Sequence, residues 1–178
     1  GTGYDFVDID VESYEKDGFK LINKEDYTAS DSDPMDFDGH GTHVAGIVAA
    51  TGNNEEGVVG VCMGCRIMPV RAGFDIRFRG DVYGLFEDAN IADSIYYAAD
   101  NGADIISMSF GGGSPSKLIE DALNYAYNKG VVLVAAAGNS GSSTKEYPAA
   151  FDNVIAVTAT NNVDKRAYFS VCNTTRSK

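Results

Sequence analysis

The sequence predicts an α/β fold of three layers, in which helices cover both faces of a mostly parallel sheet. Two observations predict this class: helical and extended segments alternate along the chain from Gly39 onward, and the extended segments are apolar throughout. Continuously apolar strands are typical of parallel sheets that are buried on both faces. Functional residues of such sheets gather at the carboxyl ends of the strands, so chemistry is expected in the loops that follow them.

Residues 1–38 are predicted to be an acidic lead-in that is rich in loops, with a short strand at 4–7. Residues 8–38 are dense in Asp, Glu, Ser and Lys and show little periodicity, so they are predicted to form a long surface loop. A solvated acidic surface is the simpler interpretation of this loop, and a cation site is the alternative.

Residues 39–178 are predicted to form the α/β core. Apolar residues recur there at helical spacing, with Gly102 and Gly130 as stop signals and Ser116 as an N-cap. The predicted helices cover residues 41–51, 89–101 and 117–128. The predicted strands cover residues 66–71, 104–109, 131–137 and 154–157. Loops are predicted at residues 52–57 and 73–86.

The charge balance excludes some classes of partner. The 178 residues carry 14 Lys and Arg against 26 Asp and Glu, a net charge of −12. Nucleic acids and anionic membranes bind clustered basic residues, so neither is an expected partner. The longest apolar run, residues 131–137, is far shorter than the ~20 residues that span a bilayer. The first residues include no initiator Met and no signal-peptide pattern, so we expect a mature form or an excised part.

The cysteines indicate a local structural role. There are three, Cys62, Cys65 and Cys172, and an odd number excludes a fully paired intramolecular set. The C-x-x-C spacing of Cys62 and Cys65 also occurs in redox pairs and zinc sites, but no second cluster completes a zinc shell. A local disulfide or two packed thiols is therefore the prediction.

Residues 39–49, Gly-His-Gly-Thr-His-Val-Ala-Gly-Ile-Val-Ala, place a histidine at the start of a helix with almost no polar face. Such a helix is expected to be buried. An imidazole held there suits a general base, because histidine titrates near neutrality. A satisfied core histidine is the alternative for His40, whereas a structural, hydrogen-bonded role is the prediction for His43. Zinc binding by the pair is disfavoured because no third ligand is evident.

Two predicted strands end in glycine-rich segments. Residues 107–113 read Ser-Met-Ser-Phe-Gly-Gly-Gly, and residues 135–141 read Ala-Ala-Ala-Gly-Asn-Ser-Gly. Glycines at a strand end leave backbone groups free to face a ligand. Asn139 is placed to present its amide to the same crevice, although it would also suit a simple turn.

Three separated motifs in this chain resemble the catalytic domain of subtilisin-like serine proteases. They are Gly-His-Gly-Thr-His-Val-Ala-Gly at 39–46, Ser-Met-Ser-Phe-Gly-Gly at 107–112 and Ala-Ala-Gly-Asn-Ser-Gly at 136–141. They occur in the order of that family, and the resemblance extends from Gly39 to about Ser170. It implies a serine endopeptidase that hydrolyses peptide bonds. It also implies that residues 1–178 are the central part of one subtilisin-like peptidase domain, so that the fold of this segment is incomplete.

The resemblance implies roles residue by residue. His40 would be the general base, and Asn139 would donate a hydrogen bond to the oxyanion. A protein or peptide substrate in extended conformation would pair with a strand edge and insert side chains into pockets. The residues implied to bind it are Ser109, Phe110, Gly111, Ala136 and Gly138. An extracellular or cell-envelope location is likewise implied by the family alone.

The loop at 52–58 resembles the calcium loop of the family. The implied ligands are the carbonyls of Thr51, Glu56 and Val58 and the side-chain oxygen of Asn54. Calcium takes about 6–8 oxygens, so this loop cannot complete the site alone. No organic cofactor is expected.

The catalytic triad is incomplete in this sequence. Subtilisin-like enzymes need Asp, His and Ser in that order, and no Gly-Thr-Ser-Met-Ala nucleophile segment occurs among the 178 residues. Asp8 and Asp10 are the nearest candidates for the acid, but neither precedes the expected Ser/Thr-Gly. We expect a segment of an active protease, with a non-catalytic peptide-binding relative as the alternative. A nucleotide-binding fold is disfavoured because no G-x-G-x-x-G or Walker motif is present.

Overall fold

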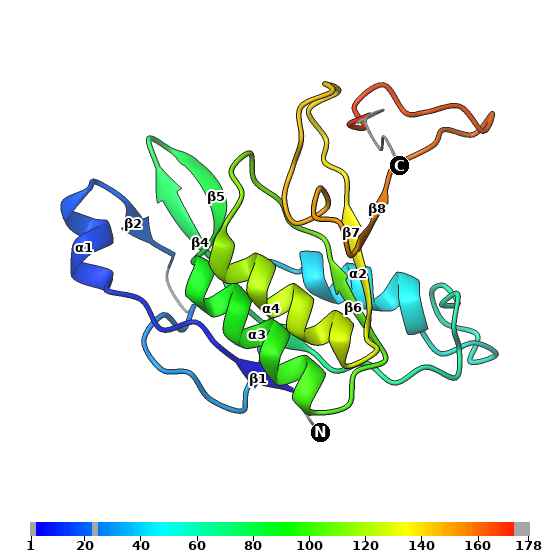
Figure 1. Ribbon diagram of the computed structural model, residues 1–178. Coiled ribbons are helices and arrows are strands. Elements are labelled where there is room, and N and C mark those ends of the chain that lie inside the picture. The colour runs from blue at the N-terminus through cyan, green and yellow to red at the C-terminus, as the bar shows by residue number, and fades with distance from the viewer. Residues whose placement is uncertain (1–2, 23–24, 173–178) are drawn as a thin grey trace. The chain divides into compact units, whose positions relative to one another are not determined.

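The computed structural model describes residues 3–22 and 25–172 (Figure 1). The chain forms two compact units, residues 1–94 and 95–178, and helix α3 (Asp88–Asp100) runs through the boundary. Both units contain parallel strands, so the predicted α/β class with parallel strand pairing is confirmed. None of the helices in the described ranges is long and apolar enough to cross a membrane.

The first unit is built around a small parallel pair and an antiparallel sheet. Its elements before α3 are β1 (Tyr4–Asp5), α1 (Val11–Lys16), β2 (Lys20–Leu21), α2 (His40–Ala49), β3 (Val70–Arg71), β4 (Gly73–Phe78) and β5 (Asp81–Phe86). Strands β1 and β3 pair in parallel, and β2, β4 and β5 form a three-stranded antiparallel sheet in that order. The strand predicted at 4–7 is therefore present but shorter, and the strand predicted at 66–71 is reduced to its last two residues.

The predicted loops at 8–38 and 73–86 are corrected by the structure. Residues 73–86 form the β4–β5 hairpin, whose two connecting residues, Arg79 and Gly80, have φ of 53° and 102°. Positive φ at both positions is typical of tight two-residue hairpin turns. Isolated apolar residues of the acidic lead-in pack against the hairpin in one buried cluster: Val7, Ile9 and Tyr27 with Phe74 and Ile76. Glycines and charged residues interrupt the alternation of polar and apolar residues in the hairpin. In the acidic lead-in, single buried residues produce no hydrophobic periodicity that the sequence could show.

The helix predicted at 41–51 is observed as α2 over His40–Ala49, but its burial was wrongly predicted. No residue of α2 is buried, and Ile47 is 53% exposed. The apolar composition of a helix shows that burial would stabilise it. Whether the helix is buried depends on which other segments pack against it. Residues 60–62 lie along α2, and their backbone N–H groups donate hydrogen bonds to the carbonyls of Ala50, Ile47 and Val48 at 2.8–3.0 Å.

The second unit contains the predicted parallel sheet. Strands β6 (Ile105–Met108), β7 (Val132–Ala136) and β8 (Val154–Val157) pair in that order, with Ile105 opposite Val132 and Leu133 opposite Val154. Helix α4 (Lys117–Asn128) has the predicted bounds and buries Ile119, Ala122, Leu123 and Ala126.

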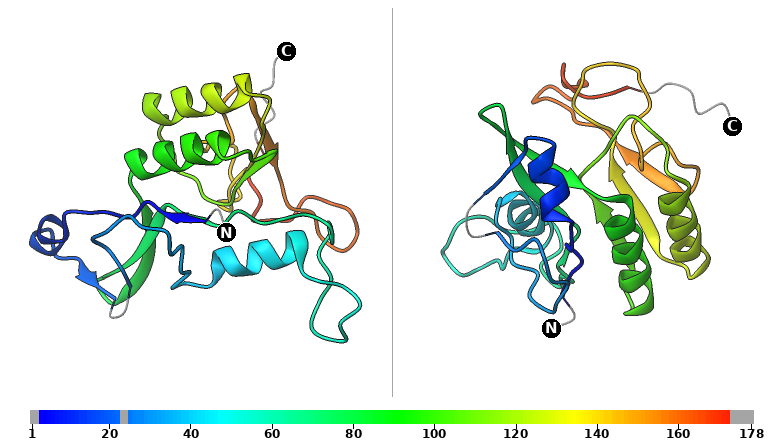
Figure 2. Two further views of the ribbon diagram at one scale, coloured as in Figure 1. Left: turned by 90° about the horizontal axis from the view of Figure 1, so that it is seen from below. Right: turned by 90° about the vertical axis from the view of Figure 1, so that its left-hand side faces the viewer.

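Helices α3 and α4 lie side by side (Figure 2), where the rings of Tyr96 and Tyr125 are 5.0 Å apart. Tyr125 also donates a hydrogen bond from its hydroxyl to Asp100 at 2.7 Å. These contacts join the carboxyl-terminal part of α3 to α4 within the second unit.

Candidate active site

Asp36 binds the first turn of α2 through both of its carboxylate oxygens. Its Oδ1 accepts hydrogen bonds from the backbone N–H groups of Asp38 at 3.2 Å and Gly39 at 2.8 Å. Its Oδ2 accepts the backbone N–H of Thr42 at 2.8 Å and the Thr42 hydroxyl at 2.7 Å. Asp38 Oδ2 accepts the backbone N–H of His40 at 3.0 Å. The backbone on both sides of His40 is therefore held by carboxylates.

The charge on Asp36 is stabilised by these bonds. Partial burial acts to raise its pKa, but the Thr42 hydroxyl and the backbone N–H groups outweigh burial and lower the pKa of Asp36 below its usual value. An ionised carboxylate at a helix N-terminus also interacts favourably with the helix dipole. Asp36 was not predicted from the sequence, although an Asp shortly before a helix start is a recognisable capping signal.

A buried ionic network joins this turn to the hairpin. The Arg71 guanidinium donates hydrogen bonds to the carboxylates of Asp5 and Glu25, the latter at 2.8 Å, and lies 5.1 Å from the centroid of the Phe37 ring. Glu25 also accepts the backbone N–H of Asp75 at 2.9 Å. Burial raises the pKa of Asp5 despite the opposing effects of a backbone N–H and of Arg71. Phe37 lies between Asp36 and Asp38 in sequence, so Arg71 supports the loop before His40.

The candidate histidines and aspartates differ in the contacts that their side chains make. His40 and His43 are both exposed, and the His43 side chain forms no hydrogen bond with the residues that the structure describes. The structural, hydrogen-bonded role predicted for His43 is therefore not observed, because the face of α2 that carries it is uncovered. Asp10 caps α1 by accepting the Ser13 N–H at 3.2 Å, and Asp8 is an exposed bridge residue opposite Thr28. In the described ranges, no cluster of at least three His, Cys, Asp or Glu side chains could hold a metal ion.

The second unit contains a pocket of about 360 Å³ where β6 and β7 end. It gathers all the residues for which the sequence predicted a substrate-binding or oxyanion role there: Ser109, Phe110, Gly111, Ala136, Gly138 and Asn139. Ser140 and Glu146 also line it, and neither was predicted. Glu146 immediately precedes Tyr147, and no local pattern connects it to the strand ends.

Backbone pairing holds the pocket together. Gly112 and Tyr147 exchange two backbone hydrogen bonds of 2.9 and 2.8 Å, which place residue 146 beside the segment that follows β6. On the other wall, the carbonyl of Gly138 accepts the N–H of Val171 at 3.0 Å. Gly138 has φ of 106°, and a Cβ there would lie 2.6 Å from the carboxyl carbon of Glu146. Only glycine fits this position.

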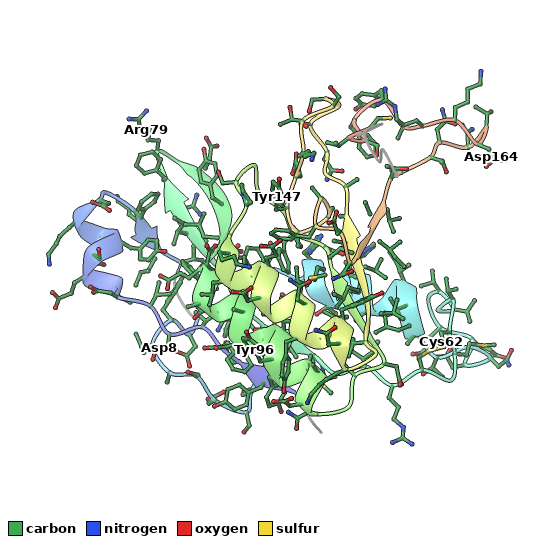
Figure 3. The ribbon with its side chains drawn as sticks, in the orientation of Figure 1. Asp8, Cys62, Arg79, Tyr96, Tyr147 and Asp164 are labelled. Atoms are coloured by element: carbon green, nitrogen blue, oxygen red, sulfur yellow. A yellow bond between two sulfur atoms is a disulfide. The ribbon has the colours of Figure 1, made fainter. Side chains whose placement is uncertain are left out.

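The loop resembling a calcium site is exposed. Asn54 Oδ1 accepts the backbone N–H of Glu56 at 3.2 Å, and Thr51, Asn54, Glu56 and Val58 are all exposed on one short segment. Nearby, Cys62 and Cys65 form a disulfide (Figure 3), and Cys172 is a free, half-buried thiol. The disulfide is one of the two arrangements predicted for the C-x-x-C pair.

Comparison with known proteins identifies the class. Residues 7–176 match the subtilase family of serine peptidases, so the chain belongs to the subtilase family. It is 46% identical over 169 residues to the thermophilic serine proteinase of Bacillus sp. (strain AK1), covering 95% of this chain and 39% of that protein. It is 40% identical over 171 residues to thermitase of Thermoactinomyces vulgaris, covering 96% of this chain and 59% of that protein.

Similarity to further proteases supports membership of the subtilase family. The chain is 42% identical over 145 residues to the minor extracellular protease Epr of Bacillus subtilis (strain 168), covering 81% of this chain and 21% of that protein. Among solved structures, it matches proteases from Pseudoalteromonas arctica with a TM-score of 0.73 and 30% identity, over 95% of this chain and 53% of that one. The predicted subtilisin-like fold is thereby confirmed, and the chain spans little more than half of these relatives at most.

Proposed function

We propose that these residues supply the general base, the oxyanion donor and the substrate-binding pocket of a subtilisin-type serine endopeptidase. One observation carries the proposal: residues 109–111 and, from a distant segment, Ala136, Gly138 and Asn139 line a single pocket together with Glu146. Family membership supports hydrolysis of peptide bonds as the reaction.

In this mechanism His40 takes a proton from the nucleophilic serine and returns it to the leaving amine. The side-chain amide of Asn139, which is exposed in the pocket, donates a hydrogen bond to the oxyanion of the tetrahedral intermediate. Asp36 and Asp38 hold the backbone on both sides of His40 in this mechanism. We infer that the serine and the triad aspartate lie outside these 178 residues, because the sequence has no Gly-Thr-Ser-Met-Ala segment and its relatives are longer.

The substrate is proposed to be a protein or peptide in extended conformation. Residues 109–111 continue directly from β6, which is the outer strand of its three-stranded sheet. An extended backbone is expected to pair with this segment as an added strand. The pocket would then receive the side chain beside the scissile bond.

The test is labelling of the intact protease by a fluorophosphonate, which reacts with an activated serine. The wild-type protein is expected to label, and His40→Ala is expected to abolish labelling. A His40→Ala variant that labels normally would refute the role of His40. Peptide binding without labelling or turnover in the intact protein would instead support the alternative, a non-catalytic peptide-binding relative.

We also propose that the loop at 51–58 binds calcium as a structural ion. The support is a set of oxygen donors on one exposed segment, the carbonyls of Thr51, Glu56 and Val58 and the Asn54 amide oxygen. The loop would hold part of the coordination sphere, since calcium takes about 6–8 oxygens.

An extracellular location is proposed from the relatives, one of which is named as an extracellular protease. Recovery of the intact protein from the culture medium rather than the cell pellet would test it.

A further inference from the structure

Glu146 gives the pocket of the second unit its charge. Of the residues that line the pocket, only Glu146 carries a formal charge. The remainder offer small walls, one aromatic ring, an amide and hydroxyl groups. A ligand side chain that enters this pocket therefore meets a carboxylate against otherwise neutral surroundings.

The carboxylate lies against both walls of the pocket. A Cβ on Gly138 would be 2.7 and 2.8 Å from the two Glu146 oxygens, and a Cβ on Gly111 would be 3.4 Å from Oε2. The two backbone bonds between Gly112 and Tyr147 fix the position of the neighbouring residue 146. Glu146 is therefore a fixed part of the pocket wall.

The charge of Glu146 is left available to a ligand. Its side-chain hydrogen bond is a long one, 3.4 Å from the Ser140 hydroxyl to Oε1. The described ion pairs of this unit lie elsewhere: Lys117 with Glu120 and Asp121, and Lys129 with Asp100. Lys145 precedes Glu146 in sequence but is exposed and forms no ion pair with it in the described part of the chain. A carboxylate has about four acceptor sites, so most of its capacity is unused.

We propose that Glu146 makes this pocket select a basic side chain, lysine or arginine, in the substrate residue that enters it. The inference rests on the proposed protease function and names the substrate class of the same site. A half-buried carboxylate binds an ammonium or guanidinium group by a charge-assisted hydrogen bond, while the apolar stem packs on the pocket walls. An acidic side chain is repelled by the same charge.

The test compares peptides that differ only in the residue before the scissile bond, which is Lys, Phe or Glu. With the intact protease, kcat/KM is expected to be highest for Lys and lowest for Glu. Glu146→Gln keeps the size and a hydrogen-bonding amide, and it is expected to lower the Lys-to-Phe ratio of kcat/KM by about tenfold. Raising the salt concentration is expected to lower the same ratio in the wild type but not in the variant.

Asp164→Asn is the matched control because it removes one negative charge from the same unit. Asp164 is exposed at the outer end of its loop, away from Tyr147 (Figure 3), and its φ of 56° suits asparagine. This variant is expected to keep the wild-type ratio. An equal fall in Asp164→Asn and Glu146→Gln would show a general charge effect and overturn the proposal.

The outcomes distinguish this inference from the proposed function. Cleavage of all peptides with the same ratios in wild type and Glu146→Gln would overturn the basic preference and leave the protease assignment intact. Absence of any cleavage would remove the protease function. The preference is then read from equilibrium binding of the same peptides: a Lys preference that Glu146→Gln abolishes supports the inference, and equal binding overturns it.

Discussion

The turn that carries His40 and the pocket that carries Asn139 are held by different kinds of contact. Around His40, the carboxylates of Asp36 and Asp38 accept backbone N–H groups, and the Arg71 network supports the loop from behind. Around the pocket, backbone pairs with backbone, and glycine allows the close approach to Glu146.

This contrast indicates where single substitutions should act. Side chains hold the turn that carries His40, so changing one carboxylate should disturb both local structure and the pH dependence of stability. Backbone pairing positions the pocket walls, so side chains in the pocket are free to determine chemistry and selectivity.

Asn139→Ala should have the largest effect and should leave the fold unchanged. If the intact protein has the proposed protease activity, kcat is expected to fall by about 10²–10³, the magnitude known for an oxyanion-hole asparagine of subtilisin and not one obtained from this geometry. The Tm should stay within about one degree because Asn139 is exposed. A rise in KM with unchanged kcat would show that Asn139 binds substrate but does not stabilise the oxyanion.

Gly60→Ala tests the close packing behind α2. A Cβ at Gly60 would lie 2.4–2.6 Å from backbone atoms of Ala49 and Ala50, and backbone cannot move aside as a side chain can. We expect the free energy of unfolding to fall by about 2–3 kcal/mol, measured by urea denaturation.

Gly46→Ala is the matched control for that variant. Gly46 lies within α2, and nothing lies within 4 Å of a Cβ placed there. Alanine in a helix interior is more stable than glycine by about 0.5–1 kcal/mol, so this variant should be slightly stabilised. Equal destabilisation of the two variants would contradict the packing argument.

Asp36→Ala should destabilise the protein by about 1–2 kcal/mol at neutral pH, since the first turn of α2 loses its cap. The pKa of Asp36 is lower in the folded state, so its contribution is present above the unfolded pKa and is lost as pH falls through the folded pKa. The difference in unfolding free energy between wild type and Asp36→Ala should therefore shrink on acidification. A difference that stays constant with pH would contradict this role.

Asp75→Asn is expected to change the stability of the first unit in the opposite direction to Asp36→Ala. Burial and the charges of Asp38, Glu25 and Asp36 raise the pKa of Asp75, so its ionised form opposes folding. The variant is expected to be more stable than wild type at neutral pH, and this gain should vanish at low pH, where Asp75 is protonated. Urea denaturation at a series of pH values measures both variants, and destabilisation by Asp75→Asn at neutral pH would show that ionised Asp75 favours folding instead.

Removal of calcium should have the smallest effect. If the loop at 51–58 holds the ion, EDTA should lower the Tm by a few degrees, which corresponds to about 1 kcal/mol. Asn54→Ala should remove most of this sensitivity, because it deletes the only side-chain oxygen among the proposed ligands. An EDTA shift that is the same in both proteins would place the ion elsewhere.

Much of the second unit could be predicted from its sequence. Helix α4 has the predicted bounds, β8 does too, and β6 and β7 lie within their predicted ranges. These elements carry their signals within a short window: an amphipathic period, an N-cap serine, a terminal glycine and continuous apolar strands. The first unit was predicted less well, because the hairpin and the buried cluster depend on pairing between distant segments.

The amino-acid sequence was sufficient to identify the subtilisin-like class, the histidine at the start of a helix and the glycine-rich strand ends. Each of these is written in contiguous residues. Tertiary contacts were needed to place Glu146 in the pocket, and to show that Asp36 and Arg71 hold the turn before His40. The exposure of α2 was likewise revealed only by the tertiary structure. The physical reason is that hydrogen bonds, charge proximity and burial depend on which distant segments meet, and local periodicity carries no information about that.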